Sequence, residues 1–526
     1  MKHSPPGPNY FGPQAAQDLY ELLVAATEAE NQNLPRSQRL KIPTNLPNLV
    51  VALVIAELEP VCCIPCGKGC EESDLDLIGV YQNDGPDEGT YSTTDQALRR
   101  VIRQYNKTIT RSDVDEIRVM LHDYARKKPR CMDRDLIPVN NGIFDYKNKK
   151  LLPFDKDKVF LHKCKVNYNP LAQNDIIHSP DDGSDWDVES WVAGLSNDPE
   201  IVNLIWESLG AIIRPYVRWN KSVWLYSTCG NSGKGCICTL ARNLVGEGNY
   251  ASLTLKEFAG RFNLGQLIGV SAIINDENDV GTYVDSAASL KAVITNDVIS
   301  IERKYKQPIP YQFFGFMIQC LNEFPRFRDR SNSFYRRQLF VEFDKCYTGA
   351  EKPIIKDDYL SRPEVLEYVL YKVLNMNYYQ LSEPAACREL LEDLKESNDP
   401  VRQFMNEFSD QFVWDLLPFT FLYDLYKEWF HRVNPGGAIL SRPAFIRELI
   451  DIVKDHPVWM CKGKKHQEAP KHMMDAPELL IAKYGLKDWM NPNYKGPDLN
   501  NTCYTALSTS YRGLLRRSFV AGGITN

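Results

Sequence analysis

The most constraining feature of the sequence is a glycine-rich run, WLYSTCGNSGKG, at residues 224–235. An apolar segment that breaks into glycines and ends in Gly-Lys predicts a strand, a tight loop and then a helix. Backbone N–H groups at the start of such a helix, together with the lysine, can hold the phosphates of a nucleotide. We therefore expect an ATP site in which Lys234 contacts phosphate. The residues expected around the nucleotide are Cys229, Gly230, Asn231, Ser232, Gly233, Lys234, Gly235 and Cys236.

The run departs from the usual phosphate-loop pattern at two positions. Thr228 stands where the pattern has glycine, and Gly235 stands where it has serine or threonine. Because Gly235 has no hydroxyl, the usual side-chain ligand of Mg²⁺ is absent, unless water or Cys236 replaces it. Taken alone, the run is also compatible with an ordinary strand-turn-helix corner.

Two carboxylates follow the next apolar segment. Residues 267–274, LIGVSAII, predict a buried strand that ends close to Asp276 and Glu277. Carboxylates at the carboxyl end of a core strand, shortly after a phosphate loop, suit a magnesium ligand and a base that activates water. We assign Asp276 to the metal and Glu277 to the base. Without the preceding glycine run, a strand capped by solvated acids would be the better interpretation.

A third apolar segment, residues 313–321, ends at Asn322. An amide at that edge can orient the attacking water, although it can also simply cap a turn. Arg336 and Arg337 then precede a predicted strand at 338–343. An arginine there is either a surface charge or a group that reaches the nucleotide of a neighbouring subunit.

The order of these motifs resembles superfamily-three helicases, which are ring-forming AAA+ proteins of small DNA viruses, poxviruses, phages and plasmids. The sequence is most similar to the phage and plasmid primase-helicase branch, whose phosphate loops often read Asn-x-Gly-Lys-Gly, as residues 231–235 do. This resemblance spans about residues 130–460. It implies ATP and Mg²⁺ as cofactors, DNA as partner, a hexamer and 3′-to-5′ movement.

The resemblance also implies roles for individual residues. Lys234 becomes the phosphate lysine, Asp276 and Glu277 the magnesium and water pair, and Asn322 the sensor. Arg337 becomes the arginine finger, with Arg336 as its competitor.

A hairpin that grips DNA in the central pore is expected at residues 301–308. Its contacts would come from Lys304, Tyr305 and Lys306, because cations pair with phosphates and a ring can stack on a base. Outside this context, a solvated lysine-rich turn would be the better interpretation.

The last part of the sequence predicts a winged-helix-like domain. Helices are expected at 419–431 and 441–453, separated by a turn at 434–437, and a basic hairpin is expected at 458–466. Such modules bind DNA, but they also serve as packing or docking units. The side chains expected to contact DNA are Arg442, Arg447, Lys462, Lys464 and Lys465.

Length and composition predict a multi-domain α/β protein. The 526 residues exceed the usual limit of one core. We expect an α+β module at 1–130, a pre-helicase hairpin and helical collar at 131–215, and the AAA+ motor with a parallel sheet at 216–350. A helical lid at 351–397 and the winged-helix-like domain at 398–526 would follow. Residues 1–130 are compatible with a priming remnant, an origin-binding module or a partner-docking module.

The cysteines and the charge limit the class of protein. Four cysteines at 62, 63, 66 and 70 could bind zinc, but a strand at 49–64 that ends in a tight loop explains them better. Most of the 14 cysteines are expected to be reduced. The net charge of −6 gives no overall attraction to DNA, so basic patches must supply it. Neither a membrane span nor a signal peptide is expected, which places the protein in the host cytosol.

Together these features predict an ATP-driven ring helicase that replicates a mobile element, assisted by other replication proteins. An origin-binding initiator or loader that uses ATP for assembly is the alternative, and Gly235 keeps it open. A fused primase-helicase is disfavoured because the region before the motor is short.

Overall fold

The computed structural model comprises two compact units, residues 1–391 and 392–526. It describes residues 12–65, 76–180, 182–260, 262–279, 283–284, 287–303, 306–327, 329, 331–433, 439–504 and 507–518. The predicted multi-domain α/β class is confirmed, and the first unit contains the predicted parallel sheet.

The central sheet has five strands in the order β10-β11-β15-β9-β17, and every neighbouring pair is parallel. The strands are β9 (Ser222–Tyr226), β10 (Tyr250–Ala251), β11 (Ala272–Asn275), β15 (Phe316–Leu321) and β17 (Gln338–Glu342). All residues of β9, β11 and β15 are buried, as expected for parallel strands covered on both faces. The carboxyl ends of these three adjacent strands therefore meet at one edge of the sheet.

Two of these strands are shorter than the sequence suggests. The strand expected from residue 267 begins only at Ala272, because residues 263–267 form a 3₁₀ helix and Gly269 turns the chain with φ of 80°. The strand expected from residue 313 begins at Phe316. The carboxyl ends of both strands still lie directly before Asp276 and Asn322, so the shortening does not displace the candidate site.

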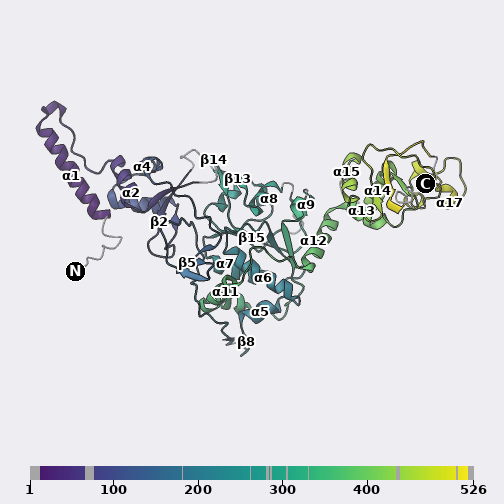
Figure 1. Ribbon diagram of the computed structural model, residues 1–526, viewed down its shortest axis with the longest axis horizontal. Coiled ribbons are helices and arrows are strands. Elements are labelled where there is room, and N and C mark those ends of the chain that lie inside the picture. Colours follow the sequence, from purple (N-terminus) through teal and green to yellow (C-terminus); the bar gives the residue numbers. More distant parts are fainter. Residues whose placement is uncertain are drawn as a thin grey trace. The chain divides into compact units, whose positions relative to one another are not determined.

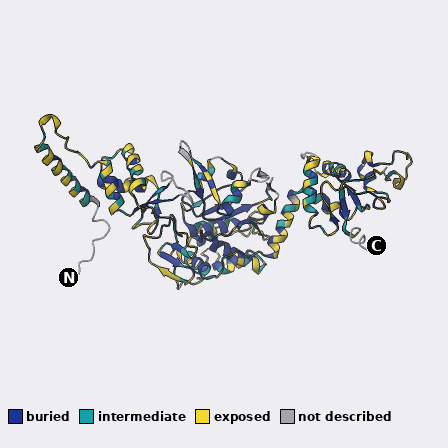
Figure 2. Ribbon diagram, turned by 45° about the horizontal axis from the view of Figure 1, so that its top comes forward, coloured by how far each residue is buried: buried dark blue, intermediate teal, exposed yellow. Residues whose placement is uncertain are grey.

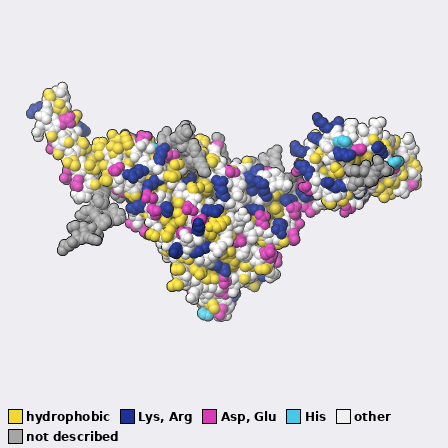
Figure 3. Space-filling model, viewed as in Figure 1, with side chains coloured by type: hydrophobic (Ala, Val, Ile, Leu, Met, Phe, Trp, Pro, Cys, Tyr) yellow, Lys and Arg dark blue, Asp and Glu magenta, His cyan; other side chains and the backbone are white. Residues whose placement is uncertain are grey.

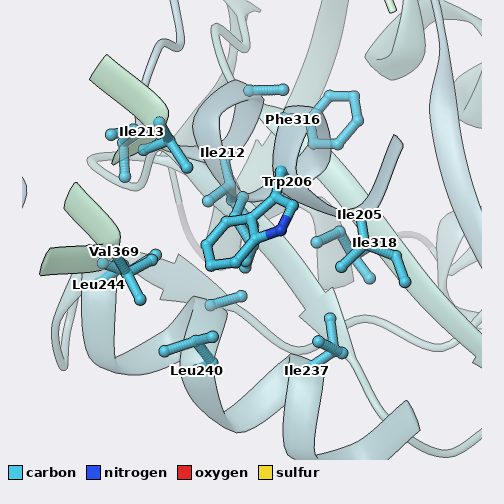
Figure 4. Packing of buried hydrophobic residues seen from close by; sticks show 14 of the residues in the cluster. Ile205, Trp206, Ile212, Ile213, Ile237, Leu240, Leu244, Phe316, Ile318 and Val369 are labelled. Atoms are coloured by element: carbon cyan, nitrogen blue, oxygen red, sulfur yellow. The ribbon is translucent and has the colours of Figure 1, made fainter. Parts of the chain in front are cut away.

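Three helices form the layer on one face of this sheet, α6 (Pro199–Ile212), α7 (Lys234–Val245) and α11 (Pro363–Asn375). Asp198 caps α6 by accepting a hydrogen bond from the Glu200 backbone N–H at 2.8 Å. Apolar side chains of α6 and α7 meet those of β15 in one core (Figure 4). A helical collar was expected within residues 131–215, and α6, which lies in this range, is buried almost throughout. It is therefore a core helix of its own unit. The expected lid helix, α11, packs against α6 and α7 in the same core.

On the other side of the sheet lie α8 (Ala288–Ile294) and a hairpin of β13 (Val298–Arg303) and β14 (Lys306–Gln312) (Figure 1). The hairpin is antiparallel, with Ile301 opposite Ile309. The predicted hairpin at 301–308 is thus present. Lys304 and Tyr305 lie outside the described residues.

The residues before the central sheet form a smaller α+β arrangement. The elements of its first part are α1 (Gly12–Gln32), α2 (Asn48–Leu58), β1 (Val61–Ile64), β2 (Leu77–Tyr81), β3 (Tyr91–Ser92), α3 (Asp95–Tyr105) and α4 (Arg111–Tyr124). Next come β4 (Leu136–Val139), β5 (Gly142–Asp145), β6 (Lys150–Leu152), β7 (Ile177–His178), β8 (Asp185–Trp186) and α5 (Val188–Gly194). Figure 2 shows that α1 is largely exposed, whereas β1, β2, β4 and β5 are largely buried.

The prediction of a strand at 49–64 is wrong for most of these residues. Residues 48–58 form helix α2, and only Val61–Ile64 pair as a strand. The run is apolar almost throughout, so its periodicity does not distinguish a buried helix from a strand. Helix α2 packs against α3 and α4, and this packing stabilises the helix.

The second unit contains the three-stranded antiparallel sheet β18-β20-β19. Its elements are α13 (Pro400–Phe408), β18 (Leu416–Pro418), α14 (Phe419–Val433), α15 (Arg442–Ile452), β19 (Trp459–Met460), α16 (Leu480–Tyr484), α17 (Leu499–Thr502) and β20 (Gly513–Arg516). Helix α12 (Ala385–Asn398) spans the division between the units. The two predicted helices are present. The hairpin predicted at 458–466 is wrong, because β19 pairs with the distant β20 rather than with a neighbouring strand. The predicted turn at 434–437 lies outside the described residues.

Candidate functional site

The glycine loop, residues 227–233, connects β9 to α7 as the sequence predicts. Asn231 and Gly233 adopt positive φ values of 53° and 94°, which turn the chain sharply before the helix. Glycine tolerates this conformation without strain, and asparagine tolerates it better than most residues. Lys234 is the first residue of α7. The loop thus delivers backbone N–H groups and one lysine to the helix N-terminus, as anion binding requires.

The Lys234 ammonium is held within this loop. Its side chain is only 6% exposed, and Nζ donates to the Ser232 hydroxyl at 3.2 Å and to the Ser227 carbonyl at 3.4 Å. Burial lowers the pKa of Lys234. A charge held by two neutral oxygens in a buried position is prepared to exchange them for an anion.

The segment that follows β17 covers the glycine loop. The Tyr347 N–H donates to the Asn231 carbonyl at 3.1 Å, and Asn231 Nδ2 donates to Glu351 at 2.7 Å. Cys229 and Cys346 form a disulfide. This pairing was not predicted from the sequence, because the two cysteines are separated by 117 residues. The loop is therefore fixed from outside as well as by its own turns.

The expected acidic and amide residues follow β11 and β15, which are the next two strands of the sheet on one side of β9. Asp276 and Glu277 follow β11, and Asn322 follows β15. Glu277 and Asn322 are exposed. The sheet order therefore brings the glycine loop and these three residues to adjacent strand ends.

The Asp276 carboxylate forms an ion pair with an arginine that was not predicted from the sequence. Arg242 of α7 donates to both carboxylate oxygens, at 2.8 and 3.0 Å. These hydrogen bonds are the main reason why the pKa of Asp276 is lowered. An arginine two turns after Lys234 lies on the face of α7 that Lys234 occupies, which is the signal that could have identified it.

The described groups do not fit the magnesium site expected at this edge. Gly235 offers no hydroxyl, and Asp276 is engaged by a guanidinium. Mg²⁺ prefers free oxygen ligands in near-octahedral geometry. Asp276 was expected to bind the metal, but its carboxylate is not free to do so in this structure.

Asn278, which the sequence analysis also passed over, joins the ends of β11 and β15. Its Nδ2 donates to Gln319 Oε1 at 2.9 Å and to the Cys320 carbonyl at 3.0 Å, and its Oδ1 accepts from the Leu255 N–H. Gln319 in turn donates to the Leu253 carbonyl at 3.0 Å. This network fixes the backbone from which Glu277 and Asn322 project. In the sequence, the only signal for Asn278 is its position two residues after Asp276.

The two candidate finger arginines have different surroundings. Arg337 Nη1 donates to the carbonyl of Ser333 and, at 2.8 Å, to its hydroxyl. Arg336 is exposed and has no side-chain hydrogen bond among the described residues. Arg337 is thus held within its own chain, whereas Arg336 is free to reach outward.

The second unit contains a basic groove of about 510 Å³. Its lining includes Phe419, Arg442, Lys464, Lys465, Tyr511 and Arg512. Three of these residues were predicted to bind DNA, and Arg512 was not. Lys and Arg side chains also gather on the visible face of this unit (Figure 3). The groove brings together cations from segments up to 70 residues apart in the sequence.

The remaining predicted basic residues lie in other settings. Arg447 is exposed on α15 outside the groove lining, and Lys462 pairs with Glu468 at 3.1 Å. The side chain of Lys306 is not among those described.

Neither a metal cluster nor a membrane span is found in the described part of the chain. Cys62 and Cys63 are buried in β1, and burial raises their pKa values to about 12 and 11. Cys66 and Cys70 lie outside the described residues. No described helix is both long enough and apolar enough to cross a bilayer.

Three family models match the chain. A model of D5 N-terminal-like domains matches residues 64–191, and a model of poxvirus D5-like proteins matches residues 396–481. The chain is D5-like in these two regions. The resemblance to the poxvirus-like primase-helicase branch, predicted from the motifs, is thereby confirmed. A model of a family of unknown function, DUF5906, matches residues 225–337, which include the glycine loop, Asp276, Glu277 and Asn322.

Solved structures of the C-terminal region of NrS-1 are also similar. One apo form is 13% identical, with a TM-score of 0.40, over 81% of this chain and 86% of that chain. Another, of residues 305–718, is 12% identical, with a TM-score of 0.42, over 89% of this chain and 100% of that chain.

Proposed function

We propose that the protein is an ATP-dependent, ring-forming replicative DNA helicase of a phage, plasmid or related mobile element. The observation that supports this most is the sheet order, because β11, β15 and β9 place an acidic pair, an amide and the glycine loop at neighbouring strand ends. Groups of these types hold the phosphates and position the attacking water when a terminal phosphate is hydrolysed. The D5-like matches support a role in replication.

In this proposal ATP lies at the interface between two subunits. The glycine loop N–H groups and Lys234 hold the phosphates, and Asn322 orients a water molecule. Glu277 accepts a proton from that water as its oxygen attacks the terminal phosphorus, and ADP leaves. We propose Mg²⁺ as an ion carried by the phosphates, because Asp276 is paired with Arg242.

The neighbouring subunit would supply the arginine that stabilises charge on the transferred phosphoryl group. The surroundings of the two candidates favour Arg336, since Arg337 is hydrogen-bonded to Ser333 in its own chain. An arginine used in trans requires assembly, and we propose a hexamer.

DNA would contact the protein at two places. We propose that the hairpin of β13 and β14, with Lys304, Tyr305 and Lys306, grips one strand in the pore and moves it 3′ to 5′ as ATP is hydrolysed. The basic groove would act as a winged-helix-like contact to duplex or forked DNA, with its cations on phosphates. Other replication proteins could dock elsewhere on the chain.

The test is ATP-dependent separation of forked DNA by the wild type, Lys234→Ala, Arg336→Ala and Arg337→Ala, with assembly size followed by light scattering. We expect Lys234→Ala to weaken nucleotide binding by about tenfold to a hundredfold, as loss of a charged hydrogen bond predicts. Arg336→Ala should keep nucleotide binding and assembly but lose hydrolysis by about a thousandfold, which is typical of an arginine finger. Arg337→Ala should have the smaller effect. Equal hydrolysis by Arg336→Ala and the wild type would reject Arg336 as the finger.

An origin-binding initiator or loader is the second candidate, and the pairing of Asp276 with Arg242 favours it. A site poorly suited to magnesium would hydrolyse slowly and could use ATP to control assembly. A wild type that binds ATP and DNA and assembles, yet separates no strands on forks of either polarity, would favour this candidate. Under it, Lys304→Ala with Lys306→Ala should leave DNA binding by the second unit intact.

A further inference from the structure

A lysine outside the expected motifs lies beside the position from which the magnesium ligand is missing. Lys356 belongs to α10 (Pro353–Asp357), which packs against α7. A Cβ atom built on Gly235 would lie 3.7 Å from Lys356 Nζ. A Mg²⁺ ion bound by a serine hydroxyl would lie at most about 3.5 Å from the same carbon, given metal–oxygen distances of about 2.1 Å. The ammonium is therefore about as far from this carbon as the metal would be.

The carboxylate near this position is already paired without a metal. Asp276, the carboxylate that would attract Mg²⁺, is engaged by both terminal nitrogens of Arg242. Lys356 forms no ion pair within the described part of the chain, so its charge is available to a ligand. A divalent cation placed here would meet a lysine and an arginine at close range.

The charge of Lys356 affects the pKa values of two neighbouring groups, as its position beside Gly235 implies. Hydrogen bonds from Arg242 are the main cause of the lowered pKa of Asp276, and the charge of Lys356 acts in the same direction. Burial raises the pKa of Cys236, and Lys356 opposes that rise. The Lys356 charge therefore acts on both the strand-end carboxylate and the first turn of α7.

We propose that the glycine loop binds nucleotide without requiring Mg²⁺, because the Lys356 ammonium supplies positive charge to the phosphates where the metal would otherwise do so. This inference rests on the proposed function, since it concerns the same nucleotide site. It adds Lys356 to the residues that contact the nucleotide and makes the affinity for nucleoside triphosphate nearly independent of the metal.

The experiment measures binding of a fluorescent ATP analogue to the full chain, once with Mg²⁺ and once with EDTA. We expect the wild-type affinity to change by less than about threefold between the two conditions, and Lys356→Gln to bind about tenfold or more weakly in EDTA, as loss of a charged hydrogen bond predicts. Lys356→Arg keeps the charge and should bind in EDTA like the wild type.

Two further variants sharpen the result. Lys352→Gln is the matched control, because Lys352 is exposed on the same segment and pairs with Asp182 at 3.0 Å. It should bind like the wild type. Gly235→Ser restores the hydroxyl at a position where a Cβ makes only ordinary contacts, and it should increase affinity when Mg²⁺ is present.

The outcomes separate this inference from the proposed function. If the wild type binds only with Mg²⁺, and Lys234→Ala weakens that binding, the nucleotide site stands and the inference is wrong. If Lys356→Gln binds like the wild type in EDTA, the inference is also wrong. If the wild type binds no nucleotide in either condition, the proposed function itself fails.

Discussion

The glycine loop and the basic groove both present positive charge, but they hold it differently. In the first unit, Lys234 is buried and hydrogen-bonded within the loop, and Arg242 is paired with Asp276. In the second unit, Arg442, Lys464 and Lys465 are exposed and form no ion pair among the described residues.

This difference indicates two kinds of anion. Buried, fixed cations lose little entropy on binding and suit one small ligand in one geometry. Exposed, mobile cations are screened by salt and suit an extended polyanion with many phosphates. We therefore expect nucleotide binding to depend on single residues and to be little affected by salt. DNA binding by the groove should depend on the sum of several residues and fall steeply with salt.

Lys234→Ala should produce the largest effect on ligand binding. It removes the buried ammonium beside the loop, and we expect affinity for an ATP analogue to fall by about tenfold to a hundredfold, as loss of a charged hydrogen bond predicts. Lys256→Ala, a surface lysine paired with Asp279, is the control. Titration at low and at high salt would test the comparison directly. A steep salt dependence of wild-type nucleotide binding would contradict it.

Replacement of Arg442, Lys464 and Lys465 by alanine should weaken DNA binding and flatten its salt dependence. On duplex DNA, the slope of log affinity against log salt should fall by about 0.9 for each phosphate that the variant no longer neutralises. Fluorescence anisotropy of a labelled duplex measures this slope. Lys454→Ala, whose lysine pairs with Asp451, should leave the slope unchanged. An unchanged slope in the triple variant would show that the groove does not bind DNA.

Burial also affects an ionisable group outside both sites, His162. Burial, assisted by Arg130, lowers the pKa of His162 to about 3 from 6.5. The unfolded chain therefore binds a proton below pH 6.5 that the folded chain refuses until about pH 3, so stability falls on acidification through this window. From about pH 7 to about pH 5 the loss attributable to His162 is about 2 kcal/mol.

His162→Gln should remove that part of the fall in unfolding free energy, measured by urea denaturation at the two pH values. Equal pH dependence in the wild type and His162→Gln would show that His162 does not titrate in this way.

The smallest expected effect distinguishes paired from unpaired cations in the second unit. Lys462 pairs with Glu468, whereas Lys464 lines the groove. We expect Lys464→Ala to weaken DNA binding severalfold and Lys462→Ala by less than about twofold, because the Glu468 carboxylate already balances that charge. If Lys462→Ala weakened DNA binding more than Lys464→Ala, Lys462 rather than Lys464 would be the residue that contacts DNA.

The glycine loop could be predicted because its geometry is encoded locally. Gly233 and Lys234 are adjacent, and an apolar strand before them is enough to predict strand, loop and helix. The strands that end near Asp276 and Asn322 were found for the same reason. Their amino-terminal bounds were missed because apolar runs do not show where hydrogen-bonded pairing starts.

What could not be predicted depends on residues that are distant in the sequence. The partners of Cys229 and Asp276 lie 117 and 34 residues away, and apolar patterns say nothing about such pairs. The basic groove needs Arg512, which is next to a strand too short to recognise from its sequence. The helix at 48–58 was mistaken for a strand because Val and Ile favour strands locally, while packing against α3 and α4 decided otherwise.

The strand order of the second unit also affects how the chain folds during synthesis. Strands β18 and β19 do not pair with each other, and each pairs with β20, which is translated more than 50 residues after β19. While the ribosome is still making residues 461–512, the backbone N–H and C=O groups along one edge of each strand therefore lack their partner. Closure of this sheet must be a late event, and a nascent chain stalled before residue 513 would present two unpaired edges to chaperones and to other copies of itself.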